Sequence, residues 1–119
     1  MTVGADLGDI TSLPVVDRAA LDAIAAVDAE LLGELVDCYR RDGRAHVSAI
    51  VAAYERQDIE SVRSHAHAMK GASGTIGARR VQRLCAILQR AALEEAGRGV
   101  ADLRDAFEAS LRAISIAAS

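Results

Sequence analysis

Apolar residues recur every three or four positions along most of this chain, and this spacing predicts amphipathic helices. Four long segments show the pattern, and short polar breaks separate them. The predicted helices cover about residues 29–55, 59–76, 78–96 and 100–115. A shorter amphipathic segment follows Pro14. Together these segments predict an all-α fold, an antiparallel four-helix bundle with a short additional N-terminal helix across one end.

Residues between the segments agree with these boundaries. Asp28 and Asp58 are suitable N-caps for the predicted helices over residues 29–55 and 59–76, which are the second and third helices when the short helix after Pro14 is counted first. An aspartate oxygen accepts hydrogen bonds from free backbone N–H groups. Gly77 is suited to the C-terminus of the third helix. We expect the glycines of Gly97–Gly99 to end the fourth helix.

The length of 119 residues fits one domain with a single core. Residues 1–13 have no sustained period and several glycines, so we expect a flexible leader there, followed by one helical-bundle domain over residues 14–119. Cys38 and Cys85 are isolated and lack metal-ligand spacing. We therefore interpret them as small buried apolar residues and expect no disulfide and no zinc site.

Charge and hydropathy argue against several classes of function. The formal net charge is −3 without a long basic run, so the electrostatic pattern of a nucleic-acid-binding protein is missing. No run of about 18 consecutive apolar residues occurs, and the first residues do not resemble a targeting signal. We expect a cytoplasmic monomer that binds neither nucleic acid nor a membrane.

The third predicted helix carries the candidate chemistry. Its apolar seam steps by threes and fours through Ile59, Val62, Ala66, Met69, Ser73 and Ile76. At about 100° per residue, His67 lies about 100° from the line through Ala66 and Met69, so its ring is expected to be exposed beside the seam. Close to His67 on the same stripe are Arg63, Lys70, Gly71 and Gly74. The glycines leave room for a large partner at the imidazole, and the two cations favour a negatively charged one.

Each of these assignments has an alternative. Gly71 and Gly74 would also suit close helix packing, and Arg63 would also suit a solvated surface. His65 is about 200° from His67 on a helix, so the two rings cannot share one metal ion. We interpret His65 as an ordinary boundary residue. A phosphate-binding loop is excluded because its lysine would follow the glycines, whereas Lys70 precedes them.

The other histidine, His46, lies on the apolar stripe of the second predicted helix. It is interpreted as a hydrogen-bonded residue at the edge of the core. No set of nucleophile, base and orienting residue can be assembled from the sequence.

The segment "AHAMKGASGTIGARRVQRLCAILQ", residues 66–89, resembles the histidine-containing phosphotransfer (HPt) domain family. The family signature is a histidine, an apolar residue two positions later, a Lys-Gly pair, two small residues, a glycine and then a helix with a leucine/cysteine pattern. The matching residues here are His67, Met69, Lys70, Gly71, Ala72, Ser73, Gly77, Val81, Leu84, Cys85 and Leu88. A looser resemblance extends over residues 13–115.

The resemblance implies a phosphocarrier in a two-component phosphorelay. His67 would accept a phosphoryl group on Nε2 from a receiver aspartate and pass it to an aspartate of another receiver. Gln89, at the position that the family uses, would orient the ring through the other nitrogen. Lys70 would contact the phosphoryl oxygens, and Arg63 is a candidate for additional charge support.

The resemblance also has implications for cofactors and partners. Mg²⁺ is expected in the partner receiver domain and no cofactor in this chain. The partners would be response-regulator receiver domains and an upstream hybrid histidine kinase. No nucleotide-binding motif is present, so we expect a chain that is not an enzyme, either free or part of a hybrid kinase.

Two other functions remain as alternatives at this point. A helical protein–protein interaction module without chemistry would show the same apolar seams. A metal-binding bundle that uses His65 is the second alternative. The stripe of His67, Lys70 and the two glycines favours the phosphocarrier, because neither alternative needs it.

Overall fold

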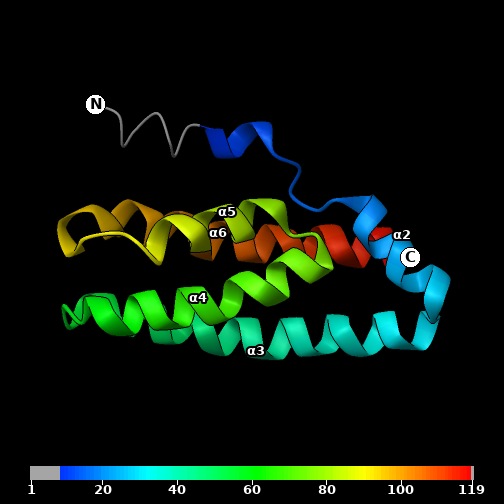
Figure 1. Ribbon diagram of the computed structural model, residues 1–119, viewed down its shortest axis with the longest axis horizontal. Helices are drawn as coiled ribbons and strands as arrows, with labels where there is room; N and C mark the ends of the chain where they lie inside the picture. The colour runs from blue at the N-terminus through cyan, green and yellow to red at the C-terminus, as the bar shows by residue number, and fades with distance from the viewer. Residues whose placement is uncertain (1–8, 119) are drawn as a thin grey trace.

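The computed structural model describes residues 9–118 of the chain. This part contains the short 3-10 helix η1 (Asp9–Ser12) and the helices α2 (Arg18–Val27), α3 (Ala29–Glu55), α4 (Ile59–Ile76), α5 (Arg79–Leu88) and α6 (Leu93–Ala118), with no strand. Helices α3 and α5 each pack against both α4 and α6, which gives the antiparallel four-helix bundle of Figure 1. The predicted all-α fold class is therefore confirmed.

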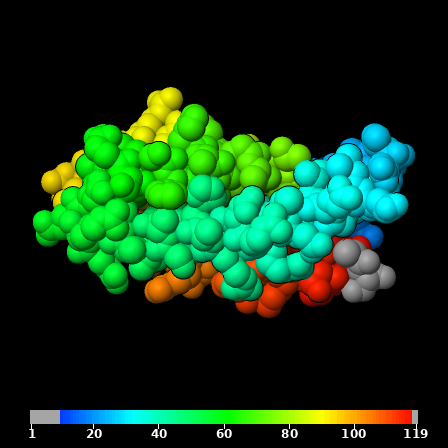
Figure 2. Space-filling model, turned by 90° about the horizontal axis from the view of Figure 1, so that it is seen from below, coloured from blue at the N-terminus to red at the C-terminus, as the bar shows by residue number. Residues whose placement is uncertain are grey.

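Helix α2 lies across one end of the bundle, beside the start of α3 (Figure 1). Helices α3 and α4 run along each other and form one face of the molecule, which Figure 2 shows from below. No helix within residues 9–118 combines the length and hydrophobicity that a membrane span requires.

The predicted caps lie at the start of α3 and at both ends of α4. Asp28 Oδ1 accepts hydrogen bonds from the backbone N–H groups of Glu30 and Leu31, at 2.9 and 3.3 Å. Asp58 accepts from the backbone and the hydroxyl of Ser61, at 3.2 and 2.7 Å, and these bonds lower the pKa of its carboxyl group. Gly77 ends α4 in the left-handed conformation, with φ 84°. The predicted boundaries of both helices are confirmed.

The prediction that Gly97–Gly99 ends the fourth helix is wrong. Helix α5 already ends at Leu88, and both glycines lie inside α6. A Cβ atom on Gly97 would stand 2.5 Å from the Tyr54 hydroxyl, and one on Gly99 would stand 2.9 Å from Leu88 Cδ2. These glycines therefore allow neighbouring helices to approach α6 closely, and the chain turns instead at residues 89–92.

Residues 9–13 of the expected leader make contacts with the bundle. Helix η1 buries Ile10 against the bundle. The Arg80 side chain of α5 donates hydrogen bonds to the carbonyl oxygens of Leu13 and Thr11, at 2.7 and 3.2 Å. A buried apolar side chain and two side-chain hydrogen bonds hold this segment, and the irregular hydrophobic pattern gave no sign of them. Residues 1–8 of the expected leader lie outside the described residues.

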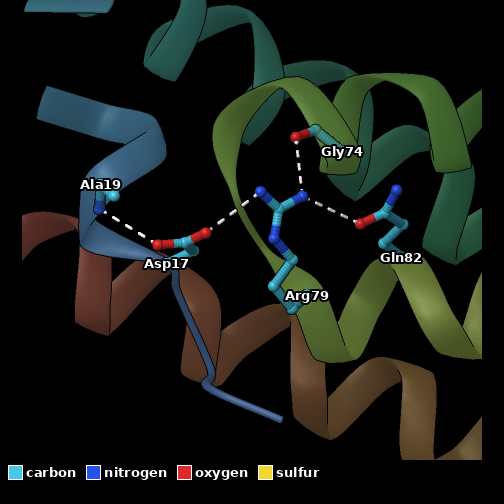
Figure 3. A network of polar contacts seen from close by, with 5 residues as sticks. All are labelled: Asp17, Ala19, Gly74, Arg79 and Gln82. Carbon is cyan, nitrogen blue, oxygen red and sulfur yellow. Dashed lines mark hydrogen bonds and ion pairs between the residues drawn. The ribbon is translucent and has the colours of Figure 1, made fainter. Parts of the chain in front are cut away.

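Arg79 connects α2 to the end of α4, as Figure 3 shows. Its guanidinium group pairs with Asp17, the N-cap of α2, at 3.2 Å and donates to the Gly74 carbonyl at 3.2 Å and to Gln82 Oε1 at 3.1 Å. The Asp17 backbone N–H donates to the Gly77 carbonyl at 2.7 Å. These contacts fix α2 at the C-terminal end of α4.

All four long helices contribute to the core. Its largest fully buried side chains include Ile50, Met69, Ile76, Leu84, Leu88, Leu103 and Phe107. The predicted seam of α4 is buried at Val62, Ala66, Met69, Ser73 and Ile76. Because this seam is fixed against the core, the rotation of α4 about its axis is fixed as well. This rotation determines which side of α4 each of its remaining residues occupies.

Candidate functional site

His67 is exposed on α4, directly after the fully buried Ala66. Both neighbours on the seam, Ala66 and Met69, are at most 1 % exposed. The side chain of His67 therefore leaves the helix at the edge of the packed surface, as the helical spacing predicts. Its ring is accessible to a partner from solvent.

The Gln89 side chain makes a polar contact with His67 from the end of a neighbouring helix. It caps the C-terminus of α5, and its Oε1 atom lies 3.4 Å from Nδ1 of His67. An amide oxygen only accepts hydrogen bonds, so this contact favours the neutral tautomer of His67 that carries its proton on Nδ1. The lone pair of the ring is then on Nε2, on the other side of the imidazole.

Lys70 follows His67 by almost one turn and is half-buried. Within residues 9–118, its ammonium group makes neither a hydrogen bond nor an ion pair. Burial raises the pKa of the nearby Cys85 thiol to about 12, and the positive charge of Lys70 acts in the opposite direction. Lys70 therefore places an unpaired cation on the α5 side of α4, the side on which Gln89 lies.

The two glycines of the stripe differ in their surroundings. Gly71 is exposed, and a Cβ atom there would meet nothing within 4 Å. A Cβ atom on Gly74 would stand 2.8 Å from Nε2 of Gln82, whose side chain Arg79 holds. Gly71 thus leaves open surface beside His67. At Gly74 the Gln82 amide fills this space, and the predicted role of Gly74 in partner access stays a prediction.

Arg63 lies on the predicted stripe, but its side chain is engaged in contacts that the sequence does not predict. Its Nε donates to the carbonyl oxygen of Ala91, in the link between α5 and α6, at 3.0 Å. One terminal nitrogen lies 3.3 Å from Glu60 Oε2. The Arg63 side chain is nevertheless 37 % exposed, and its predicted role in charge support remains a prediction.

His65 points to the opposite side of α4 from His67. Its Nδ1 lies 3.0 Å from Nδ1 of His46 on α3, and the ring centroids are 5.2 Å apart. Burial lowers the pKa of His46, the charge of His65 lowers it further, and Asp42 acts in the opposite direction. The sequence alone gives no sign that these two histidines form a pair. In the described part of the chain, no three potential ligands from histidine, cysteine or carboxylate side chains gather as a metal site.

The comparison with known families decides the assignment. The sequence model of the Hpt domain matches residues 34–114, which is more than half of the chain. The chain is a member of the Hpt domain family. The matched range includes His67, Lys70 and Gln89.

The fold of this Hpt domain agrees with a solved structure. The crystal structure of histidine-containing phosphotransfer protein B (HptB) from Pseudomonas aeruginosa PAO1 superimposes with a TM-score of 0.79 at 21 % sequence identity. The alignment covers 88 % of this chain and 95 % of that chain. No curated protein matches the sequence.

Family membership establishes the general function of the chain. Hpt domains are phosphocarriers of two-component phosphorelays and interact with receiver domains and histidine kinases. The chain is accordingly a histidine phosphotransfer domain, and the interaction module without chemistry is not favoured. Family membership does not by itself assign a role to the individual residues.

Proposed function

We propose that His67 is the phosphoryl-accepting residue of this Hpt domain. It takes the phosphoryl group from the aspartyl phosphate of one receiver domain and passes it to an aspartate of a second one. The exposed ring with Nδ1 against Gln89 carries this proposal. His46 and His65 are occupied with each other between α3 and α4, and they are poorer candidates.

Phosphoryl transfer to His67 is consistent with the tautomer that Gln89 favours, in which Nδ1 carries the proton and Nε2 carries the lone pair. Nε2 of His67 attacks phosphorus, the P–O bond of the aspartyl phosphate breaks, and its electron pair remains on the aspartate carboxylate. The ring keeps its proton on Nδ1 and becomes positively charged. The amide oxygen of Gln89 then accepts a charge-assisted hydrogen bond, which is stronger than the bond to the neutral ring.

Lys70 and Gly71 supply the surroundings of the phosphoryl group. A phosphoryl group in transfer carries negative charge on its oxygens, and the unpaired ammonium group of Lys70 is available to neutralise part of it. The open surface at Gly71 lets the receiver approach. In-line positioning of donor and acceptor supplies much of the rate of phosphoryl transfer.

The remaining parts of the reaction are assigned to the partners. We infer that Mg²⁺ is bound by the receiver domain and that this chain needs no cofactor. The chain acts as a phosphocarrier without an ATP site, and it depends on a histidine kinase with a receiver domain as phosphoryl donor. We expect it to act as a monomer in the cytoplasm.

Radiolabelled ATP tests the proposed site. ATP and Mg²⁺ alone should leave the chain unlabelled, and addition of a histidine kinase with its receiver domain should label it. His67→Gln should abolish the label, because glutamine has no imidazole nitrogen to phosphorylate. His65→Gln is the matched control two residues away and should keep the label.

Circular dichroism of both variants verifies that each is folded before labelling. A label that persists in folded His67→Gln would falsify the assignment of the phosphohistidine to His67.

A further inference from the structure

The Arg63 side chain points along α4 toward the segment that carries Gln89. Its Nε–H donates to the carbonyl oxygen of Ala91 at 3.0 Å, across from α4 to the link between α5 and α6. Ala91 is 7 % exposed. Arg63 and His67 are four residues apart on the same helix, so one helix presents both the imidazole and the anchor of the opposing link.

We propose that Arg63 is a positioning residue for His67. It holds the Ala91 carbonyl, thereby fixes the link at residues 89–92, and keeps the Gln89 amide at Nδ1 of the imidazole. This inference rests on the proposed function of His67, and it replaces direct charge support as the main role of Arg63.

The link needs such an anchor because its backbone N–H groups donate to residues of α5 and α6 and none of them donates to α4. The backbone N–H groups of Gln89, Arg90 and Ala91 donate to the carbonyls of Cys85, Ile87 and Leu88, respectively. These bonds continue α5 but do not tie the link to α4. The hydrogen bond from Arg63 to the Ala91 carbonyl ties the link to α4.

The contact that depends on this anchor is sensitive to small movements. The Gln89 oxygen lies 3.4 Å from Nδ1 of His67. Nitrogen–oxygen hydrogen bonds usually measure about 2.7–3.2 Å, so a slight outward shift of the link would break this one. A histidine without an acceptor at Nδ1 carries its proton mainly on Nε2, and that tautomer has no lone pair there for attack on phosphorus.

The other contact of Arg63 does not explain its placement. Glu60 lies 3.3 Å away, but its side chain is 82 % exposed. Exposed ion pairs of this kind contribute little to stability. The bond to Ala91 is part-buried, and water replaces a lost donor poorly at a buried residue.

Two uncharged variants separate positioning from charge support. Glutamine places its Nε2 the same number of bonds from Cα as arginine places Nε, so Arg63→Gln keeps a donor for Ala91. Arg63→Met has a similar length and no donor. If Arg63 acts by charge on the phosphoryl group, the two variants should behave alike. If it acts by holding the link, only the methionine variant should be impaired.

The first readout is the tautomer of His67 in the unphosphorylated chain, measured by ¹⁵N NMR of the imidazole at mildly alkaline pH. The wild type and Arg63→Gln should carry the proton mainly on Nδ1. Arg63→Met should shift the ring toward the Nε2–H form, as Gln89→Leu should. The signals are assigned by their absence in His67→Gln.

The second readout is the rate at which a phosphorylated receiver transfers its phosphoryl group. Arg63→Met should be slowed about tenfold, and Arg63→Gln should stay within about twofold of the wild type. The double variant Arg63→Met/Gln89→Leu should be no slower than Gln89→Leu, because both changes remove the same contact.

Arg90→Met is the matched control, since Arg90 is an exposed arginine of the same link. In the part of the chain that the structure describes, its side chain makes no hydrogen bond or ion pair. The tautomer of His67 should be unchanged in this variant. Urea unfolding of all variants verifies that they are folded under the conditions of the measurement.

The positioning role is overturned if Arg63→Met keeps the wild-type tautomer, or if the glutamine and methionine variants behave alike. A failure of the proposed function is a separate result, because it appears as a label that persists without His67. The tautomer measurement needs no partner and stays interpretable in that case.

Discussion

The imidazole of His67 has to be held on one side and free on the other. Gln89 contacts its Nδ1, and Gly71, about one turn further along α4, leaves the adjoining surface open. An exposed glycine within a helix costs about 1 kcal/mol of stability relative to alanine. No packing contact of Gly71 offsets this cost, so the position favours a role in access for the receiver.

Gly71→Gln should therefore slow phosphoryl transfer while it stabilises the protein. Glutamine is a better helix former, and the free energy of unfolding should rise by up to about 1 kcal/mol. The added side chain stands in the approach to His67, and the rate of phosphoryl acceptance should fall about tenfold or more. Rapid-quench labelling with a phosphorylated receiver measures the rate, and urea unfolding measures the stability.

Gly33→Gln is the control for this substitution. Gly33 is also exposed within a helix and has nothing within 4 Å of its Cβ position, but it lies in the second turn of α3, the helix that follows α2. The same gain in stability is expected with an unchanged rate. Equal transfer rates in the two variants would contradict the access role of Gly71.

The sequence predicts which residues of α4 reach the surface, but not which residues of other helices they meet. Periodicity fixes the rotation of a helix about its own axis, and this suffices to expose His67. The contacts of His65 with His46 and of Arg63 with Ala91 depend in addition on how neighbouring helices are shifted along their axes. A single sequence carries no signal for that shift. The position of Gln89 is predicted by the family resemblance, and its place directly after the buried Leu88 agrees with that prediction.

At the scale of the helices, α3 and α6 pack closely because one residue has no side chain. A Cβ atom on Gly43 would collide with the Phe107 ring, which is 1 % exposed. That ring also packs against Tyr39, with centroids 5.3 Å apart. The Tyr39 hydroxyl is held in turn by Ser110 at 2.8 Å. Phe107 therefore has little freedom to move aside.

Gly43→Ala should destabilise the bundle, although alanine is the better helix former. Overpacking a core typically costs about 1–3 kcal/mol, which exceeds the gain of about 1 kcal/mol from helix propensity. Gly33→Ala, in the same helix but in open space, should instead stabilise by up to about 1 kcal/mol. Urea unfolding monitored by circular dichroism measures both. A gain in stability at Gly43 would show that α3 and α6 can separate without cost.

Capping chemistry explains which helix boundaries are predictable. Helix α4 begins after Asp58, whose side chain caps it, and ends at Gly77, whose backbone is left-handed. Both features act locally, so the sequence predicts both ends of the helix. The break between α5 and α6 contains neither glycine nor proline, so the sequence "LQRAALEE" reads as continuous helix. The sequence instead favours a break at Gly97–Gly99, because the close helix contacts that require these two glycines are tertiary.

At the scale of the whole molecule, α4 separates two environments. On its α5 side lie His67, Gln89 and Lys70, open to a partner. On its α3 side His65 meets His46 at 3.0 Å within the bundle. One of these two rings donates its Nδ1–H and the other accepts, which is satisfied only when at least one ring is neutral. The contact between α3 and α4 is therefore expected to depend on pH.

The sign of that dependence follows from His46. Burial, and after it the charge of His65, lowers the pKa of His46 below its ordinary value of 6.5, and Asp42 offsets only part of this. The unfolded chain therefore binds a proton at His46 at a higher pH than the folded chain does. The contribution of His46 to stability is therefore complete at a pH above its ordinary pKa. It is lost as the pH falls through the lowered pKa of His46 in the folded chain.

The free energy of unfolding should thus decrease as the pH falls from about 7.5 to about 5.5, and His46→Gln should flatten this decrease. His65→Gln should flatten it only in part, because it removes the neighbouring charge while the burial of His46, the larger cause, remains. Urea unfolding of the three proteins at a series of pH values measures the slopes. An equal slope in wild type and His46→Gln would mean that α3 and α4 tolerate a charged pair, and would contradict a pH-dependent contact between them.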